Sequence, residues 1–375
     1  MRHRIVRQDE DFALLREDWT ALVETLPQPL LPLRWEWFDA WWHSFGPDCA
    51  PGDEATPWIH VFEDASGIRG IVPMFVTTTR FRHVRVRAMC SMANGHSPLW
   101  DAILHPGLAE AEVARIGAAI HGTPGIDVFL YRRFAEGGRL LQWIQDGAGG
   151  RGRYGIRDSV RTPVIDTTGD WEPYLQSQGT KYRKNTRKKV REFEATPGAR
   201  VDYVRLASEA DPVFDEIVEI SARSWKTGVR NDLRTNNAGR AFLRRLLNHL
   251  GPAGAAGAWL ARINGRAIAY ELHFHGGGVT YPIRADMDEA WRELSPGSVV
   301  EFHALKAAFE DPETSAYDTC AADYWYLRNL TDRARQIHEV EYFPRGLKPL
   351  ALHLLEYRLI PLLRPVRDRA RRRFR

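Results

Sequence analysis

Apolar residues in the first part of the chain recur at two spacings, which predict both helices and strands. Residues 34–45 place aromatic side chains at helical spacing, so this segment is expected to form a helix with one broad aromatic face. The simplest role of that face is packing in a core or at a domain interface. Residues 58–64 and 68–79 are expected to form a β-hairpin. The aromatic residues of the helix are Trp35, Phe38, Trp41, Trp42 and Phe45.

The same alternation continues to a glycine-rich stretch. A helix is predicted over residues 109–121 and a buried strand over 126–131. Residues 147–155 are rich in glycine, and the seam between two domains is expected close to them.

The second half of the chain shows clearer element boundaries. Helices are predicted over residues 171–196, 211–224, 237–250 and 295–311, and strands over 199–206, 257–263, 266–275, 278–286 and 316–320. The overall expectation is an α/β (α+β) fold with two domains, residues 1–165 and 166–344, followed by a tail over 345–375.

Composition supports a folded protein of this size. The chain has 375 residues, of which 44% are hydrophobic and 27% charged, which excludes a disordered chain. Three widely spaced cysteines support neither a disulfide framework nor a zinc site. The charged N-terminal residues and the lack of any run of 18 apolar residues predict a cytoplasmic protein that does not span a membrane.

The positive charge is concentrated at the C-terminus. The net charge is +4, but the last twelve residues carry seven arginines and one acid, so the rest of the chain is slightly acidic. This distribution argues against a general nucleic-acid-binding protein. Residues 345–375 also alternate leucine-rich turns with arginines, the pattern of a helix lying in a membrane interface. The alternative is a helix packed on the body with a basic extension.

The predicted strand over 266–275 carries three ionisable side chains on one face. Because strand side chains alternate, Glu271, His273 and His275 face the same way. They could be idle surface residues, or a Glu-x-His-x-His metal site, although no further ligands cluster nearby. The more active interpretation is a general base for an amine, with His273 or Glu271 accepting the proton.

Two segments could bind anions. Residues 295–299 precede a helix without acids in its first turn, so its N–H groups could bind phosphate, or the segment could be a simple helix cap. Residues 181–194 hold seven cations that form a solvated face or contact an anionic partner. Few aromatics interleave them, which weakens the nucleic-acid alternative. The cations are Lys181, Arg183, Lys184, Arg187, Lys188, Lys189 and Arg191.

Several strings together resemble a known family. KYRKNTRKKVREFEATPGARVDYVRL, SARSWK, WLARINGRAIAYELHFHGGGVTYPIRADMDE and SPGSVVEFHALKAAFE are similar to CelD-type acyltransferases of the GNAT superfamily, relatives of the Fem peptidyltransferases. The resemblance covers about residues 4–344. It is diffuse in the first half, where only the Trp-rich helix and GIRGIVPMF carry it, and specific in the second half. One departure is DYWYLRN, where the family tends to show a Tyr-Lys pair.

The resemblance implies a fold, a cofactor site and substrate contacts. It implies two tandem GNAT-like domains, with acyl-CoA bound in the second and no metal. The pyrophosphate turn then falls on Ser295, Pro296, Gly297, Ser298 and Val299. Substrate contacts are expected from Trp225, Lys226, Tyr281, Arg284, Tyr324 and Arg328.

The expected function is acyl-CoA-dependent N-acylation at the inner face of the membrane. The tail favours a lipid amine, such as the sphingoid base or keto precursor that bacterial ceramide synthases acylate. The alternatives are acylation of an amino sugar in envelope or capsule polysaccharide synthesis, and a non-catalytic CoA-binding protein docked to a membrane assembly. A Fem-like use of aminoacyl-tRNA would require salt-dependent RNA binding by residues 181–194. No nucleic-acid partner is expected.

Overall fold

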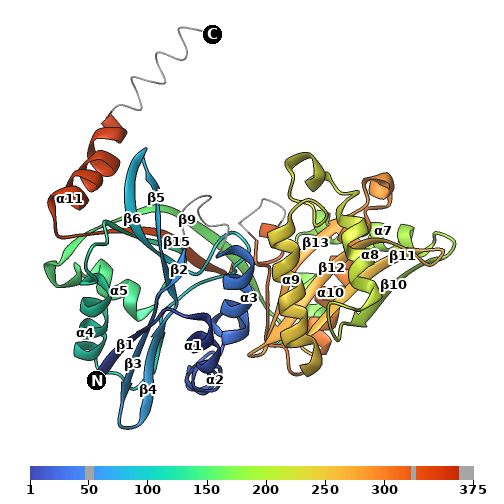
Figure 1. Cartoon of the computed structure of the whole chain (residues 1–375). Helices are drawn as coiled ribbons and strands as arrows, with labels where there is room; N and C mark the ends of the chain where they lie inside the picture. The colour runs from blue at the N-terminus through green and yellow to red at the C-terminus, as the bar shows by residue number, and fades with distance from the viewer. Residues whose placement is uncertain (47–54, 322–326, 363–375) are drawn as a thin grey trace, which may run out of the picture. The chain divides into compact units, whose positions relative to one another are not determined.

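The chain divides into two compact units. A computed structural model describes residues 1–46, 55–321 and 327–362 (Figure 1). Unit 1 comprises Met1–Pro27, Gly46–Ser159 and Gln336–Arg375, and unit 2 comprises Gln28–Phe45 and Val160–Arg335.

These units differ from the predicted ranges 1–165, 166–344 and 345–375. The boundary between Ser159 and Val160 lies inside one continuous strand, β9 (Gly152–Asp166), rather than in a glycine-rich linker. The Trp-rich helix α3 (Trp35–Phe45) groups with unit 2 although it comes early in the chain. Chain order therefore does not define these units, because each is assembled from separated segments.

Unit 1 contains two sheets with helices beside them. One sheet has the order β1-β3-β4-β7, and a second set of paired strands has the order β15-β8-β6-β5-β2. The strands of the first sheet are β1 (Arg2–Val6), β3 (Ile59–Asp64), β4 (Gly67–Val72) and β7 (Ile103–Leu104), and those of the second are β2 (Thr56–Pro57), β5 (Met74–Phe81), β6 (Val84–Ser91), β8 (Val128–Ala135) and β15 (Ala334–Pro344). The helices are α1 (Asp9–Leu14), α2 (Arg16–Glu24), α4 (Glu110–His121), α5 (Arg139–Gln145) and α11 (Leu347–Leu354).

The predicted strand over residues 68–79 is interrupted at Pro73. Its first part, β4, pairs with β3, and its second part, β5, pairs with β6 in the other sheet. Proline has no N–H to donate to a ladder, so a strand can change partners at this position with little loss of hydrogen bonding.

Unit 2 is built on one mixed sheet. Its strands have the order β10-β11-β12-β13-β14-β9, and only β13 and β14 are parallel. The strands are β10 (Ala199–Arg205), β11 (Ala256–Ile263), β12 (Arg266–Gly276), β13 (Val279–Met287) and β14 (Ala316–Asp318). The helices are α3, α6 (Trp171–Ser177), α7 (Thr180–Glu194), α8 (Pro212–Ser221), α9 (Asn237–Leu250) and α10 (Pro296–Glu310).

The predicted helix over 171–196 is two helices, α6 and α7. The chain is extended at Gln178 and Gly179, where Gly179 is the N-cap of α7. Glycine favours such a break because it loses more conformational freedom in a helix than other residues do.

Helix α3 packs against α9 in unit 2, and it is buried around most of its circumference, so Trp37, outside the predicted aromatic face, is buried as well. The rings of Trp37 and Phe45 lie 5.3 and 5.4 Å from the ring of Phe242 on α9. Asp39 adds a polar contact, since its Oδ2 lies 2.7 Å from His249 Nε2. The aromatic pattern over residues 34–45 is thus confirmed as helical core packing.

The C-terminal segment packs on unit 1 along one side. Leu352 and Glu356 are buried, and Glu356 forms an ion pair with Arg82. Leu347, Leu354, Leu359 and Leu362 are exposed, and we call them the leucine face. Residues 355–359 form a π-helical turn, which takes one extra residue, so Leu359 stays aligned with Leu354. The seven C-terminal arginines lie outside the described residues.

Candidate active site

Glu271 and His273 form a buried pair on the central strand β12. Their exposed fractions are 6% and 1%, and His273 Nε2 lies 2.7 Å from Glu271 Oε1. The interpretation of these residues as idle surface groups is therefore wrong. Both faces of β12 are covered, because α8 packs on the side of Tyr270 and α10 on the side of Glu271.

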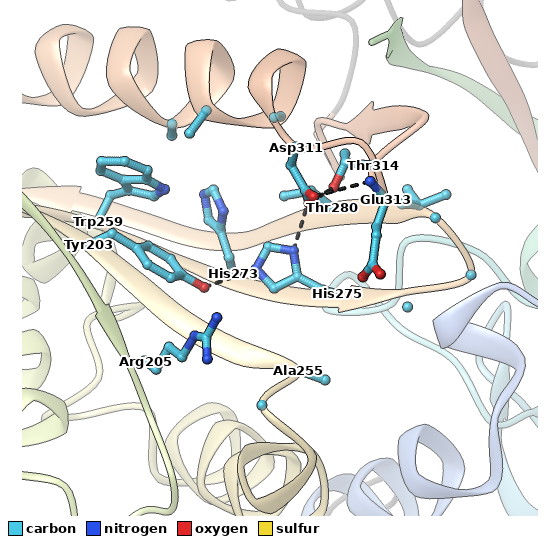
Figure 2. Close-up of a pocket in the computed structure, with 18 of the residues that line it drawn as sticks. Tyr203, Arg205, Ala255, Trp259, His273, His275, Thr280, Asp311, Glu313 and Thr314 are labelled. Atoms are coloured by element: carbon cyan, nitrogen blue, oxygen red, sulfur yellow. Dashed lines mark hydrogen bonds between the residues drawn. The ribbon is translucent and has the colours of Figure 1, made fainter. Parts of the chain in front are cut away.

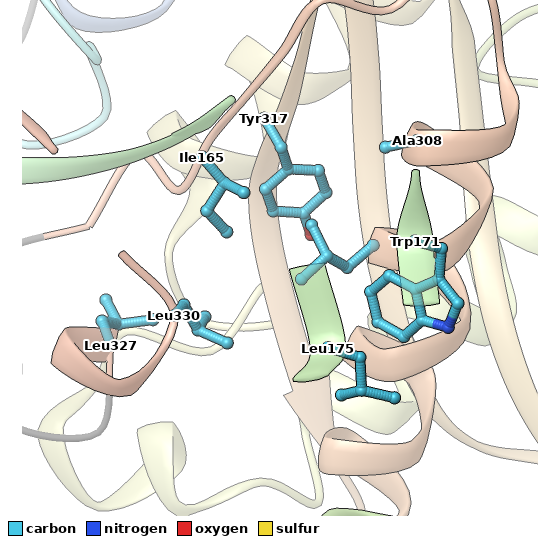
Figure 3. Close-up of a cluster of buried hydrophobic side chains, with 8 residues drawn as sticks. Ile165, Trp171, Leu175, Ala308, Tyr317, Leu327 and Leu330 are labelled. Carbon is cyan, nitrogen blue, oxygen red and sulfur yellow. The ribbon is translucent and has the colours of Figure 1, made fainter. Parts of the chain in front are cut away.

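Tyr317 contacts this pair from β14, which lies on the far side of β13. Its hydroxyl donates a hydrogen bond to Glu271 Oε1. Its ring is held in a buried cluster with Ile165, Trp171 and Leu175 (Figure 3). Burial, together with the Glu271 carboxylate, raises the pKa of Tyr317 well above its usual value, so the hydroxyl keeps its proton.

His275 lies on the same face and is hydrogen-bonded at both ring nitrogens. Its Nδ1 is 3.0 Å from Thr280 Oγ1, and its Nε2 is 3.2 Å from the Tyr203 hydroxyl. Burial lowers the pKa of His275 to about 4, with His273 adding to the shift. The ring is therefore neutral near pH 7 and orients its neighbours without carrying charge.

A cavity of about 570 Å³ opens beside these residues (Figure 2). His273 and His275 line it from β12, and Tyr203 and Trp259 line it from β10 and β11. On α10 the lining residues Ala304, Ala307 and Ala308 are small, which leaves space above the sheet.

The contact with Glu271 fixes the tautomer of His273. Because a carboxylate only accepts hydrogen bonds, His273 Nε2–H donates to Glu271, and Nδ1 is left as the basic nitrogen.

Glu301 is a second carboxyl group near Glu271 that sequence reasoning missed as a site residue. It lies on α10, and burial raises its pKa to about 8; Glu271 adds to the shift, and Lys189 opposes it. Tyr317 was also missed. Both become visible only when α10 and β14 are placed against β12, which no local pattern encodes.

The predicted anion site at residues 295–299 has fewer free backbone N–H donors than the sequence led us to expect. Ser295 adopts a left-handed conformation, and its carbonyl accepts the N–H groups of Ser298 and Val299. Pro296 has no N–H. Among the described residues at this helix start, Gly297 therefore supplies the one backbone N–H that remains available to a ligand. The expectation of several free N–H groups is therefore corrected to one.

Two side-chain donors lie at the same helix start. Lys189 Nζ on α7 donates to Ser298 Oγ over 3.1 Å. A Cβ on Gly297 would meet only Met287 Sδ, at 3.9 Å, so a ligand can approach the backbone there.

The basic helix α7 has different cations on its two sides. Lys189 faces α10, whereas Lys181, Lys184, Lys188 and Arg191 are exposed and share one face by their spacing. Arg187 pairs with Glu172.

The structure does not bring the predicted substrate residues to the cavity. Lys226 and Arg284 both bind the buried Asp286, at 2.6 and 3.0 Å, and Arg284 also contacts Ser221 on the α8 side of the sheet. Tyr270 donates to Asp286 Oδ2 on that same face. Lys226 and Arg284 therefore form ion pairs that hold α8 and the segment after it against this face of the sheet.

The remaining predicted substrate residues lie elsewhere. Trp225 is 63% exposed, and Tyr281 is buried near Asp318 and Arg335. Tyr324 and the side chain of Arg328 lie outside the described residues.

The described residues contain neither a candidate metal site nor a candidate membrane-spanning helix. No group of three or more His, Cys, Asp and Glu residues is arranged to hold a metal ion there. In the same part of the chain, no helix combines the length and apolarity needed to cross a bilayer.

Comparison with known proteins identifies the domain class of unit 2. Residues 180–328 match the family model described as an acetyltransferase (GNAT) domain. The predictions of an α/β fold and of a GNAT-type acyltransferase are confirmed at this level. No curated protein matches the chain significantly.

Three solved structures share the fold at low sequence identity. FemX matches with a TM-score of 0.55 and 11% identity over 95% of this chain and 100% of that chain. A conserved protein of unknown function from Bacteroides thetaiotaomicron matches at 0.54 and 11%, over 91% and 100%. A DUF2156 domain from Agrobacterium fabrum matches at 0.51 and 11%, over 91% and 95%.

The lowered pKa of His275 makes stability depend on pH. Between pH 6.5 and about 4 the unfolded chain binds a proton at this residue and the folded chain does not, so folding weakens as pH falls. The loss from this group is about 3 kcal/mol in total. Urea unfolding of His275→Gln at pH 7, 6 and 5 should show a shallower loss of stability than wild type. Parallel pH profiles for the two proteins would contradict the assignment.

Proposed function

We propose that this protein is an acyl-CoA-dependent N-acyltransferase. The observation that supports it best is the Glu271–His273 pair, buried in the sheet and opening on a cavity under α10. A histidine held by a carboxylate is suited to accept a proton from an ammonium or an attacking amine near neutral pH.

The helix start at residues 295–299 is the proposed site for the pyrophosphate of acyl-CoA. Gly297 N–H, Ser298 Oγ and Lys189 Nζ are the donors, and the helix dipole adds positive potential. From there the thioester would reach the sheet where β13 and β14 separate, because these strands pair only at Val279–Ala316 and Thr280–Tyr317.

The reaction follows from these positions. The amine in the cavity gives a proton to His273 Nδ1, and its nitrogen attacks the thioester carbonyl. A C–N bond forms, the C–S bond breaks, and coenzyme A leaves as a thiolate that takes up a proton. Glu271 orients the His273 ring and stabilises its charged form, while Tyr317 holds Glu271. Glu271 is the second candidate for the base.

We further propose that the acceptor is a membrane-lipid amine, such as a sphingoid base or its keto precursor. Support comes from the leucine face, followed in sequence by seven arginines that suit an anionic membrane surface. In this proposal the protein associates peripherally with the membrane.

An amino sugar is the second candidate for the acceptor. Tyr203 and Trp259 line the cavity with ring centroids 5.2 Å apart, and aromatic faces of this kind can pack against sugar rings. The non-enzymatic alternative is a CoA-binding protein. Such a protein would bind acyl-CoA but would not transfer the acyl group.

The first test concerns acyl-CoA binding. Coenzyme A or acetyl-CoA should raise the melting temperature, since a ligand at 100 times its Kd stabilises the native state by about 2.7 kcal/mol. Gly297→Asp should abolish this rise, because a carboxylate would repel the phosphates. Gly228→Asp, in the 3-10 helix Trp225–Val229 of the same unit, where an added Cβ would meet no atom within 4 Å, is the matched control and should keep it. Equal shifts in all three proteins would move the site elsewhere.

The second test concerns the base. His273→Ala should lower turnover by about 10²-fold with little change in acyl-CoA affinity, because general base catalysis contributes that much. Glu271→Gln should have a smaller effect through ring orientation. His303→Ala, on α10 and paired with Glu194, should stay near the wild-type rate. Wild-type turnover in both His273→Ala and Glu271→Gln would leave the pair with a structural role only.

The third test concerns the membrane. Changing the seven arginines to Gln should remove the dependence of vesicle binding on anionic lipid and on salt, because that attraction is Coulombic. Changing Leu354, Leu359 and Leu362 to Ser should weaken binding to neutral and anionic vesicles alike. Full-length protein that ignores anionic vesicles at low salt would rule out membrane binding and favour the amino sugar. The arginines are Arg364, Arg367, Arg369, Arg371, Arg372, Arg373 and Arg375.

A further inference from the structure

The cavity beside His273 carries fixed charges of both signs. Arg205 lines it from the end of β10, and Asp311 and Glu313 line it from the segment after α10 (Figure 2). Within the described part of the chain, no ion pair joins Arg205 to either acid, and all three side chains are exposed to solvent. Charges of opposite sign thus face the same space without neutralising each other.

Both signs of charge act on the same group in the cavity wall. Burial raises the pKa of Tyr203, Arg205 lowers it, and Asp311 raises it further. Arg205 and Asp311 are therefore both within electrostatic reach of the Tyr203 hydroxyl, which is hydrogen-bonded to His275. Both charges therefore lie near the Tyr203–His275 pair in the cavity wall.

The acidic side of the cavity suits an ammonium group. Asp311 ends α10, where the helix dipole is negative. Its oxygens accept hydrogen bonds from Glu313 N at 3.1 Å and Thr314 Oγ1 at 2.6 Å, so its position is fixed. Glu313 adds a second negative charge beside it.

The opposite side of the cavity suits an anion. A guanidinium has five N–H donors in a plane that matches two oxygens of a phosphate or carboxylate. Arg205 follows Tyr203 by two residues, so both side chains lie on the face of β10 that looks into the cavity. Arg200 lies on the other face and pairs with Asp202 at 2.7 Å.

We propose that the acceptor of this enzyme carries an anionic group, a phosphate or a carboxylate, in addition to its amine. Arg205 binds that anion, and Glu313 with the end of α10 draws the ammonium toward His273. The inference rests on the proposed function, in which this cavity receives the amine. The same chemistry is available in a phosphorylated lipid amine and in a phosphorylated amino sugar.

Binding of matched compounds to the full-length protein tests the proposal without requiring turnover. The probes for calorimetry are glucosamine with glucosamine 6-phosphate, and a short-chain sphingoid base with its 1-phosphate. At least one phosphorylated member should bind about tenfold more tightly than its partner, as expected for a charge-assisted hydrogen bond. The pair that responds identifies the acceptor as sugar or lipid.

Variants of β10 then assign the effect to one residue. Arg205→Gln should reduce the preference to about one, and Arg205→Lys should retain part of it, because the charge remains but the planar pair of donors is lost. Arg200→Gln, on the opposite face of the same strand, should keep the full preference. Melting temperatures of the three variants show that each is folded.

The outcomes separate this proposal from the proposed function. Equal affinity within both pairs, no binding by either phosphorylated compound, or a preference that survives in Arg205→Gln would overturn the proposal. Binding that depends on Arg205 without acyl transfer from any acyl-CoA would leave the charge recognition intact and contradict the acyltransferase mechanism. Acyl transfer with no preference for the phosphorylated compounds would support the acyltransferase mechanism and contradict the proposed recognition of an anion.

Discussion

The carboxylate of Glu271 is the group on which the rest of unit 2 depends. It lies on a central strand covered on both faces, where an ion without partners would cost several kcal/mol. Tyr317 and His273 supply the hydrogen bonds that offset this cost. Satisfying Glu271 therefore requires β14 to lie beside β13, and it holds the His273 ring in the wall of the cavity.

The two faces of β12 and β13 carry separate polar clusters. On one face His273 and His275 line the cavity and Glu271 binds His273, and on the other face Asp286 binds Tyr270, Lys226 and Arg284. The second cluster ties the register of two adjacent strands to α8 and the loop after it. This explains why cations that the family resemblance assigned to the substrate are used by the fold instead.

The sequence predicted what depends on local periodicity and missed what depends on distant contacts. Alternation placed Glu271 and His273 on one face, and the aromatic spacing of residues 34–45 gave α3. The breaks at Pro73 and Gly179 were visible as residue types, but at Pro73 the run of apolar residues on both sides outweighed that signal. Glu301 and Tyr317 had no local signal, because their importance comes from two elements, α10 and β14, that meet β12 only in the folded chain.

Small side chains on one helix create the space that a substrate would need. Ala304, Ala307 and Ala308 lie at helical spacing on α10, and with larger residues there the helix would fill the cavity above His273 and His275. On β11, Gly257 leaves room for the Tyr203 side chain to lie over the strand, because a Cβ at position 257 would collide with the Tyr203 hydroxyl. The size of the cavity is thus set by residues without reactive groups, and its chemistry by the few polar ones that remain. Substitutions of the first kind would alter which acceptor fits, whereas substitutions of the second kind would alter how the proton is moved.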